Sequence, residues 1–202
     1  MTLSLLMLAG CGGGSSETVE APDASEAETP AVEAADPIGI HHAEIEIRDY
    51  GTVSVELDGD TAPITVQNFM DLANAGFYNG LTFHRIIDGF MIQGGDPNGD
   101  GTGGSGKNIP GEFEANGYTN NIAHTKGVIS MARAQDPNSA SSQFFIMVAD
   151  APHLDGMYAA FGHVTEGQDV VDKIAADAAP LDDNGTMAPE DQPVIESVKI
   201  ID

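Results

Sequence analysis

The sequence predicts a mainly β domain in which an antiparallel sheet is accompanied by two α-helices. Residues 44–57 alternate apolar and polar side chains around a turn, and residues 81–161 mix short apolar runs with clusters of Gly, Asn and Asp. That mixture is typical of short strands joined by long loops. Two other stretches have the spacing of amphipathic helices. Closure would remove the exposed edges of such a sheet, but the pattern alone fits a sandwich as well as a barrel.

A hairpin and a helix are the first elements expected. Residues 44–48 and 53–57 each place their apolar side chains on one face, and the Asp-Tyr-Gly sequence at 49–51 is typical of a turn. Pro63 suits the first turn of a helix, and Gly76 follows the last turn as a stop signal. The apolar residues at helical spacing between them are Val66, Phe69, Met70 and Ala73.

The rest of the chain predicts more strands and a second helix. Short strands are expected at the apolar runs 86–87, 128–131 and 144–148. Residues 166–176 carry three apolar side chains on one helical face, and residues 194–200 form a final strand. No internal repeat is present.

The composition is strongly acidic. The chain of 202 residues has 32 Asp and Glu against 7 Lys and Arg, a formal net charge of −25. Such a charge repels phosphate backbones and anionic membrane surfaces, so nucleic acid is not an expected partner. Acidic residues occur both before and after residue 41, and a saline habitat and a secreted surface kept soluble by self-repulsion both explain them.

The single cysteine, Cys11, excludes an intramolecular disulfide. It follows Leu-Ala-Gly after an apolar start, which resembles the bacterial lipobox. The resemblance implies that residues 1–11 are a lipoprotein-type signal, that the Cys11 thiol is acylated, and that the protein is anchored outside the cytoplasm, at the cell surface or in the periplasm. A secretory signal has Lys or Arg before its apolar stretch, and this sequence has neither there. We therefore expect the translation start to lie further upstream. The alternative is an ordinary N-terminus with a chance cysteine.

Residues 12–40 are predicted to be a disordered acidic linker. They consist mostly of Gly, Ser, Glu, Ala, Pro and Thr, with too few large apolar residues to offset the entropy of ordering. Such a spacer would keep a lipid-anchored domain accessible to bulky substrates, although a linker that only aids solubility has the same composition.

The most distinctive stretch is Phe-His-Arg-Ile-Ile-Asp-Gly-Phe-Met-Ile-Gln-Gly-Gly-Asp at residues 83–96. It resembles the signature of the cyclophilins, the peptidyl-prolyl cis/trans isomerases. Four further segments resemble the remaining motifs of that family, in the family's order: 101–104 (Gly-Thr-Gly-Gly), 130–134 (Ser-Met-Ala-Arg-Ala), 142–146 (Ser-Gln-Phe-Phe-Ile) and 153–156 (His-Leu-Asp-Gly).

The resemblance covers residues 41–202 and implies a cyclophilin-type domain there. It resolves the fold as a closed eight-stranded antiparallel β-barrel with a helix over each opening, and it implies a substrate groove on the outer face. It also implies isomerisation of Xaa-Pro bonds in proline-containing polypeptides, here exported or surface proteins whose folding it would assist, by a monomer without cofactors. The membrane contact would be the lipid anchor alone.

Catalysis of prolyl isomerisation calls for a positive charge near the prolyl nitrogen. A prolyl bond resists rotation because resonance keeps it planar, and the twisted transition state has a basic lone pair on the prolyl nitrogen. By resemblance Arg85 is the catalytic residue, because its guanidinium stays charged and stabilises the twisted form more than the planar ones. In so acidic a chain an isolated arginine would otherwise be a surface ion pair.

The resemblance also assigns the substrate-binding residues. They are Phe90, Met91, Gln93, Gly101, Ala132, Arg133, Ala134, Gln143, Phe145, His153, Leu154 and Tyr158. Spacing alone would place Phe90 and Met91 in the core. Arg133 stands where many relatives have Asn, and a second cation there would favour acidic substrates. His153 replaces a Trp of vertebrate members, which should weaken cyclosporin binding, and Tyr158 stands where a His is frequent.

Other chemistry finds little support. Residues 96–101 imitate the first half of a calcium loop, but Lys107 occupies the position of the final Glu ligand, so no metal site is predicted. His124 has no partners at nucleophile-base spacing, which argues against a hydrolase. The remaining rival is a non-catalytic module that holds proline segments in the same groove as a chaperone or adaptor.

Overall fold

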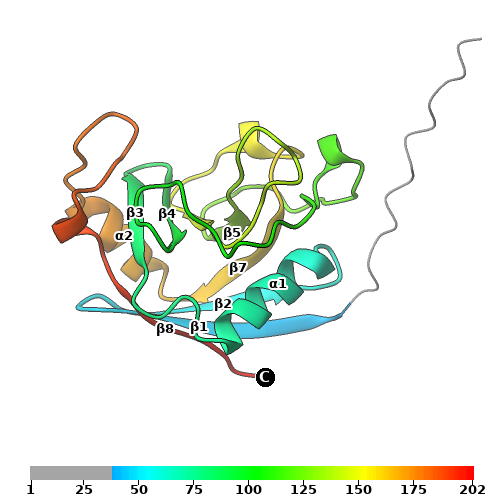
Figure 1. Cartoon of the computed structure of the whole chain (residues 1–202), viewed down its shortest axis with the longest axis horizontal. Coiled ribbons are helices and arrows are strands. Elements are labelled where there is room, and N and C mark those ends of the chain that lie inside the picture. The colour runs from blue at the N-terminus through cyan, green and yellow to red at the C-terminus, as the bar shows by residue number, and fades with distance from the viewer. Residues whose placement is uncertain (1–37) are drawn as a thin grey trace, which may run out of the picture. The chain divides into compact units, whose positions relative to one another are not determined.

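The computed structural model describes residues 38–202 (Figure 1). The predicted signal at 1–11 and the predicted linker up to residue 37 lie outside the described residues. In chain order the elements are β1 Ile40–Ile47, β2 Gly51–Asp58, α1 Pro63–Asn74, β3 Thr82–Ile87, β4 Met91–Asp96, β5 Val128–Met131, β6 Phe144–Met147, β7 Ala160–Glu166, α2 Gln168–Asp177 and β8 Ile195–Ile200. Three short 3₁₀ helices, η1 Glu114–Asn116, η2 Pro152–Leu154 and η3 Pro189–Asp191, lie in the loops.

The strands form one antiparallel sheet in the order β3-β4-β6-β5-β7-β2-β1-β8. The predicted closed barrel is wrong, because the sheet is an open half-barrel that curls through 246°. No ladder joins its edge strands β3 and β8, which meet where they begin: at the isolated bridge between Thr82 and Val194 and through main-chain hydrogen bonds beside it, from Ile195 to Leu81 and from Phe83 to Pro193. Pro193, which has no N–H to donate, precedes β8. Further along β3 the free edge pairs with Gly185 and Met187 instead.

The predicted hairpin and both helices are present. Ile47 pairs with Gly51 at the end of the β1–β2 hairpin, and α1 begins at Pro63. The buried carboxylate of Glu112 accepts hydrogen bonds from the N–H groups of Ile64 and Thr65, at 3.0 and 2.7 Å, and so replaces a local cap. The second helix begins two residues later than predicted, since β7 continues to Glu166.

Two apolar clusters occupy opposite faces of the sheet. In β6, Phe144 and Ile146 belong to the main core, while Phe145 and Met147 belong to a second cluster with Met91 of β4. This separation follows from the alternation of side chains along a strand. Both helices contribute to the main core. The second cluster therefore lies on the outer face, under the loop that contains η2.

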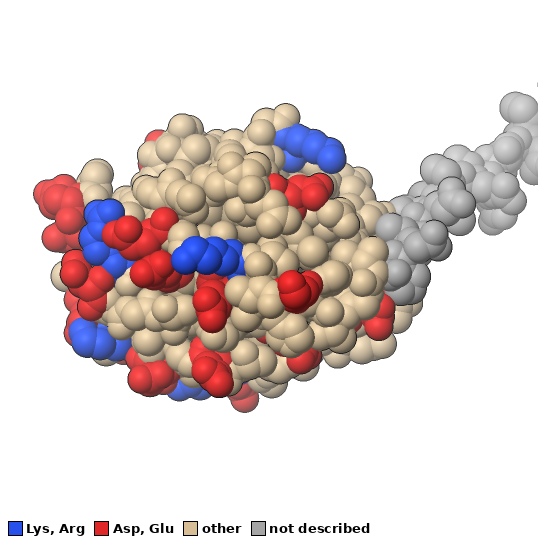
Figure 2. Space-filling model, turned by 90° about the horizontal axis from the view of Figure 1, so that it is seen from below, with Lys and Arg blue, Asp and Glu red and all other residues tan. Residues whose placement is uncertain are grey.

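The surface is acidic but not uniformly so. Figure 2 shows Asp and Glu dispersed over one face with a few Lys and Arg beside them. Among residues 38–202, four Lys and Arg side chains pair with carboxylates: Arg48 with Glu196, Lys126 with Asp172, Lys173 with Asp177 and Lys199 with Glu46. In the same part of the chain, no helix combines the length and the apolar character needed to cross a bilayer.

Candidate functional site

A small, partly apolar pocket of 160 Å³ opens on the outer face of the sheet. Its walls include the buried side chains of Met91 from β4, Phe145 from β6 and Leu154 from η2. The remaining lining residues are Arg85, Gln93, Ala132, Arg133 and Tyr158. The volume is below the roughly 300–1,000 Å³ of pockets for drug-sized ligands, so the pocket suits a single small apolar group.

Arg85 reaches this pocket from β3 and is held by uncharged acceptors. Its Nε donates to the main-chain oxygen of Asn184 at 2.8 Å, and one Nη donates to Oε1 of Gln93 at 3.3 Å. Burial lowers the pKa of Arg85, while Tyr158 and Asp182 act in the opposite direction. The guanidinium nevertheless stays charged. No carboxylate of residues 38–202 lies within 4.0 Å of it, so its charge remains available to a ligand.

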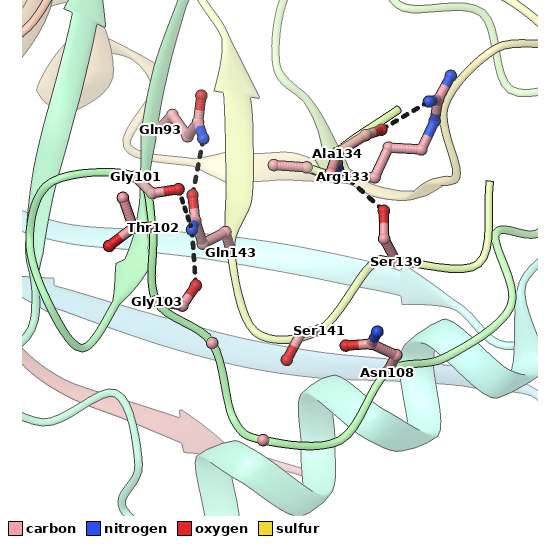
Figure 3. A pocket seen from close by; sticks show the side chains of 13 residues that line it. Gln93, Gly101, Thr102, Gly103, Asn108, Arg133, Ala134, Ser139, Ser141 and Gln143 are labelled. Carbon is pink, nitrogen blue, oxygen red and sulfur yellow. Dashed lines mark hydrogen bonds between the residues drawn. The ribbon is translucent and has the colours of Figure 1, made fainter. Parts of the chain in front are cut away.

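A second, larger pocket of 430 Å³ adjoins the first (Figure 3). The two share Gln93, Ala132 and Arg133, so they form one continuous groove. Gln93 donates to Oε1 of Gln143 at 2.9 Å, and Gln143 donates to the main-chain oxygens of Gly103 and Gly101 at 2.8 and 3.1 Å. This chain of amides connects Arg85 to the glycine-rich wall of the larger pocket and fixes the orientation of both glutamines.

Arg133 braces the wall of the groove with its side chain. Its guanidinium donates to the main-chain oxygens of Met157 and Ala134, each at 2.9 Å. It also lies 4.7 Å from the ring centroid of Tyr158, which meets Phe145 edge-on at 5.8 Å. Figure 3 shows the guanidinium turned away from Gln143. Like Arg85, Arg133 has no carboxylate partner among residues 38–202, so a preference for acidic substrates stays a prediction.

The fold brings most of the predicted site residues into this groove. Gly101, Ala132, Ala134 and Gln143 line the larger pocket, together with Gln93 and Arg133. Phe90 and His153 line neither pocket. Their rings stack on each other at 5.8 Å, with Phe90 packed against the outer cluster and His153 exposed.

Several lining residues had not been predicted from the sequence. They are Thr102, Gly103, Gly104, Gly106, Asn108, Ser139 and Ser141. The glycine-rich run at 101–106 was a usable signal for most of them, because a wall without side chains leaves room for a ligand. A Cβ on Gly104, for example, would lie 2.8 Å from Oγ of Ser141. Asn184 was also missed, and its only signal was the Asn-Gly pair of a turn.

His124 has partners that its sequence neighbourhood did not reveal. Its Nε2 lies 3.0 Å from Oγ of Ser130, and its Nδ1 lies 3.0 Å from Oδ1 of Asp155. The expectation that it lacks such partners is therefore wrong. Burial lowers the pKa of His124, which Asp155 partly offsets. Ser130 is fully buried and cannot meet a substrate, so this trio serves structure, with the His124 ring stacked 6.1 Å from Phe145.

The stretch that imitates a calcium loop uses its first carboxylate internally. Asp96 accepts hydrogen bonds from the N–H groups of Asn98, Asp100 and Gly101. Among the residues from 38 onward, no three His, Cys, Asp or Glu side chains converge as metal ligands would. Beside this loop, His84 is buried with neither ring nitrogen hydrogen-bonded, and burial lowers its pKa.

Comparison with known proteins gives consistent matches. The family model described as cyclophilin type peptidyl-prolyl cis-trans isomerase matches residues 42–200. Peptidyl-prolyl cis-trans isomerase B of Bacillus subtilis is 49% identical over 121 residues, which cover 60% of this chain and 81% of the relative. Isomerase A of Dickeya dadantii is 43% identical over 156 residues, covering 75% and 80%. A cyclophilin type isomerase of Cryptosporidium parvum, solved in the presence of the dipeptide Ala-Pro, has a TM-score of 0.70 and 30% identity, with 80% and 99% covered.

Proposed function

This chain belongs to the cyclophilin-type peptidyl-prolyl cis-trans isomerases, and we propose that it accelerates the rotation of Xaa-Pro bonds by directing the Arg85 guanidinium at the twisted imide. The substrates would be proline-containing segments of exported or surface polypeptides, and the role would be to assist their folding. In the groove, the apolar pocket would take the proline ring and the larger pocket a neighbouring part of the peptide.

The size of the task suits this mechanism. The barrier to rotation is about 18–20 kcal/mol, and uncatalysed exchange takes roughly tens to hundreds of seconds. A turnover on the order of 10² to 10³ per second requires removal of about 5.5–7 kcal/mol. No bond is broken, so the site needs neither a nucleophile nor a general base. The reaction needs only that the site stabilise the twisted state more than the planar states while it holds the proline ring in place.

One observation carries the proposal: the Arg85 guanidinium, without a carboxylate partner among the described residues, borders the apolar wall that Met91 and Phe145 give to the small pocket. Most of the bases described in this acidic chain are neutralised by a neighbouring acid. Arg85 is held instead by an amide and a main-chain oxygen, next to Met91 and Phe145. Low-dielectric surroundings strengthen the effect of such a charge on a bound imide. The relative solved with Ala-Pro supports proline-containing peptides as ligands.

A protease-coupled assay on a short Ala-Pro peptide tests the activity. We expect the full chain to accelerate cis-to-trans conversion strongly over buffer, with kcat/KM of about 10⁴ M⁻¹s⁻¹ or more, as is usual for enzymes. A chain that binds the peptide, yet converts it no faster than buffer does, would instead be the non-catalytic chaperone or adaptor. Peptide affinity measured by calorimetry on the same sample separates these outcomes from a protein that does not bind at all.

We propose that the protein is attached to a membrane through lipid on Cys11, outside the cytoplasm. The lipobox-like sequence before this residue supports the assignment. When the gene is expressed with radiolabelled fatty acid, wild-type protein should carry label and sediment with membranes. Cys11→Ala should carry no label and remain in the soluble fraction. Label that persists in Cys11→Ala would refute the lipobox interpretation.

A further inference from the structure

We infer that the turn of residues 182–186 is a positioning element for Arg85, which it orients through a main-chain oxygen. The inference rests on the proposed role of Arg85 in isomerisation. None of the cyclophilin-like motifs in the sequence includes this turn, which lies about a hundred residues after Arg85. Its contact with the guanidinium is nevertheless the shortest that Arg85 makes: Nε to the oxygen of Asn184 is 2.8 Å, against 3.3 Å for Gln93 and 3.4 Å for the Asn184 side chain.

The 182–186 turn is held rigid from within. The Asp182 carboxylate accepts from both the N–H and the hydroxyl of Thr186, at 3.0 and 2.9 Å, and the Gly185 N–H donates to the Asp182 main-chain oxygen at 3.1 Å. Because these bonds cross the turn, the direction of the Asn184 carbonyl is fixed. The carbonyl is therefore a preorganised acceptor.

The turn is also fastened to β3 on both sides of Arg85. Ile86 donates to the oxygen of Gly185 at 2.8 Å, and Met187 donates to the oxygen of His84 at 3.0 Å. Gly185 has φ +85, and a Cβ there would lie 2.6 Å from the oxygen of Ile86 and 2.5 Å from Cγ1 of Ile87. Only glycine allows the turn to approach the strand so closely. The close approach brings the carbonyl within reach of the guanidinium.

This construction contributes little to the core. Residues 181–184 are all exposed, and the turn adds no side chain to either apolar cluster. A turn that stabilised the fold by burial would present apolar groups to the sheet. What this turn presents is a carbonyl oxygen aimed at the one side chain that the proposed mechanism needs. Its effect should therefore be on turnover, with smaller effects on affinity and stability.

Gly185→Ala tests the inference in the full chain, with Gly117→Ala as the matched control. Gly117 has φ +86, no atom within 4 Å of its added Cβ, and no place in either pocket lining. Both variants bear the same left-handed backbone cost, but only Gly185→Ala must push the turn away from β3. We expect Gly185→Ala to lower kcat about 10- to 100-fold with KM changed less than about twofold, as for a misplaced catalytic group. Gly117→Ala should keep the wild-type kcat.

The Arg85 Nε–H signal in a ¹H–¹⁵N spectrum provides a readout independent of activity. It should exchange slowly with water in wild type and Gly117→Ala, and rapidly in Gly185→Ala. Unchanged exchange in Gly185→Ala, or a kcat within about twofold of the control, would overturn the inference. If wild type fails to isomerise the peptide, the proposed function fails first, and the Nε–H signal still decides whether the turn holds Arg85.

Two further variants keep the test open if Gly185→Ala folds poorly. Asp182→Ala removes the hydrogen bonds from Thr186 to the Asp182 carboxylate without adding atoms. It should lower kcat several-fold although it also removes a nearby negative charge. An unchanged or higher kcat would contradict the inference. Asn184→Ala leaves the main-chain acceptor in place and should reduce kcat less than about threefold. A loss as large as that of Gly185→Ala would show that the side chain, and not the main-chain oxygen, orients Arg85.

Discussion

Arg85→Ala is expected to reduce kcat/KM on an Ala-Pro peptide by about 10² to 10³-fold, which is the usual effect of removing one preorganised donor from a transition state. The guanidinium has no carboxylate within 4.0 Å among the described residues and adjoins the pocket lined by Met91, Phe145 and Leu154. Its loss would remove charge from the point where the prolyl nitrogen becomes basic. Most of the decrease should be in kcat, because the planar peptide gains less from the cation than the twisted one does.

Arg48→Ala is the matched control for this substitution. Arg48 is an exposed arginine paired with Glu196, outside both pockets. Its removal should leave kcat/KM unchanged and alter the free energy of unfolding by no more than about 0.5 kcal/mol. A decrease in Arg48→Ala as large as that in Arg85→Ala would indicate a general effect of charge, and a fully active Arg85→Ala would end the proposed mechanism.

Among the substitutions proposed for this protein, Phe69→Ala should cause the largest decrease in the free energy of unfolding, about 3–5 kcal/mol. Phe69 lies on the buried face of α1, and its ring centroid is 5.2 to 5.6 Å from those of Tyr78, Phe144 and Phe161. The truncation would leave a cavity that these three neighbouring rings cannot fill by small movements. Urea denaturation followed by circular dichroism measures the difference.

Leu181→Ala provides the comparison for an exposed apolar residue. Leu181 is 69% exposed, so its truncation removes almost no buried surface and should change the free energy of unfolding by no more than about 0.5 kcal/mol. If Phe69→Ala were no more destabilising than Leu181→Ala, the helix α1 would not be anchored in the core as described.

Local elements of the fold could be predicted from the sequence, whereas their closure could not. The β1–β2 hairpin and α1 follow from alternation and from Pro63, which act over a few residues. The resemblance suggested a closed barrel, but from His84 to Ile86 the free edge of β3 pairs with the segment at 185–187. The pairing of β3 with this segment depends on a turn whose tight geometry comes from Gly185. No periodicity in β3 or β8 reveals that pairing.

The candidate site, too, could be predicted from the sequence only in part. The motif at 83–96 places Arg85, Met91 and Gln93 on two paired strands, so their proximity could be expected once the strands were known. The groups that complete their surroundings come from distant loops. Asn184 reaches Arg85 from 99 residues away, and Asp155 reaches His124 from 31 residues away, so no spacing in the sequence links these pairs.

The most direct test of the role of Arg85 is the rate at which a bound Ala-Pro peptide interconverts between its cis and trans forms. Exchange NMR measures this rate on the protein itself, at concentrations that give the same bound fraction in wild type and in Arg85→Ala. We predict interconversion on the order of 10² per second or faster on wild type, and at least about 10²-fold slower on Arg85→Ala. Equal rates on the two proteins would mean that the guanidinium only helps to bind the peptide, and would contradict stabilisation of the twisted imide.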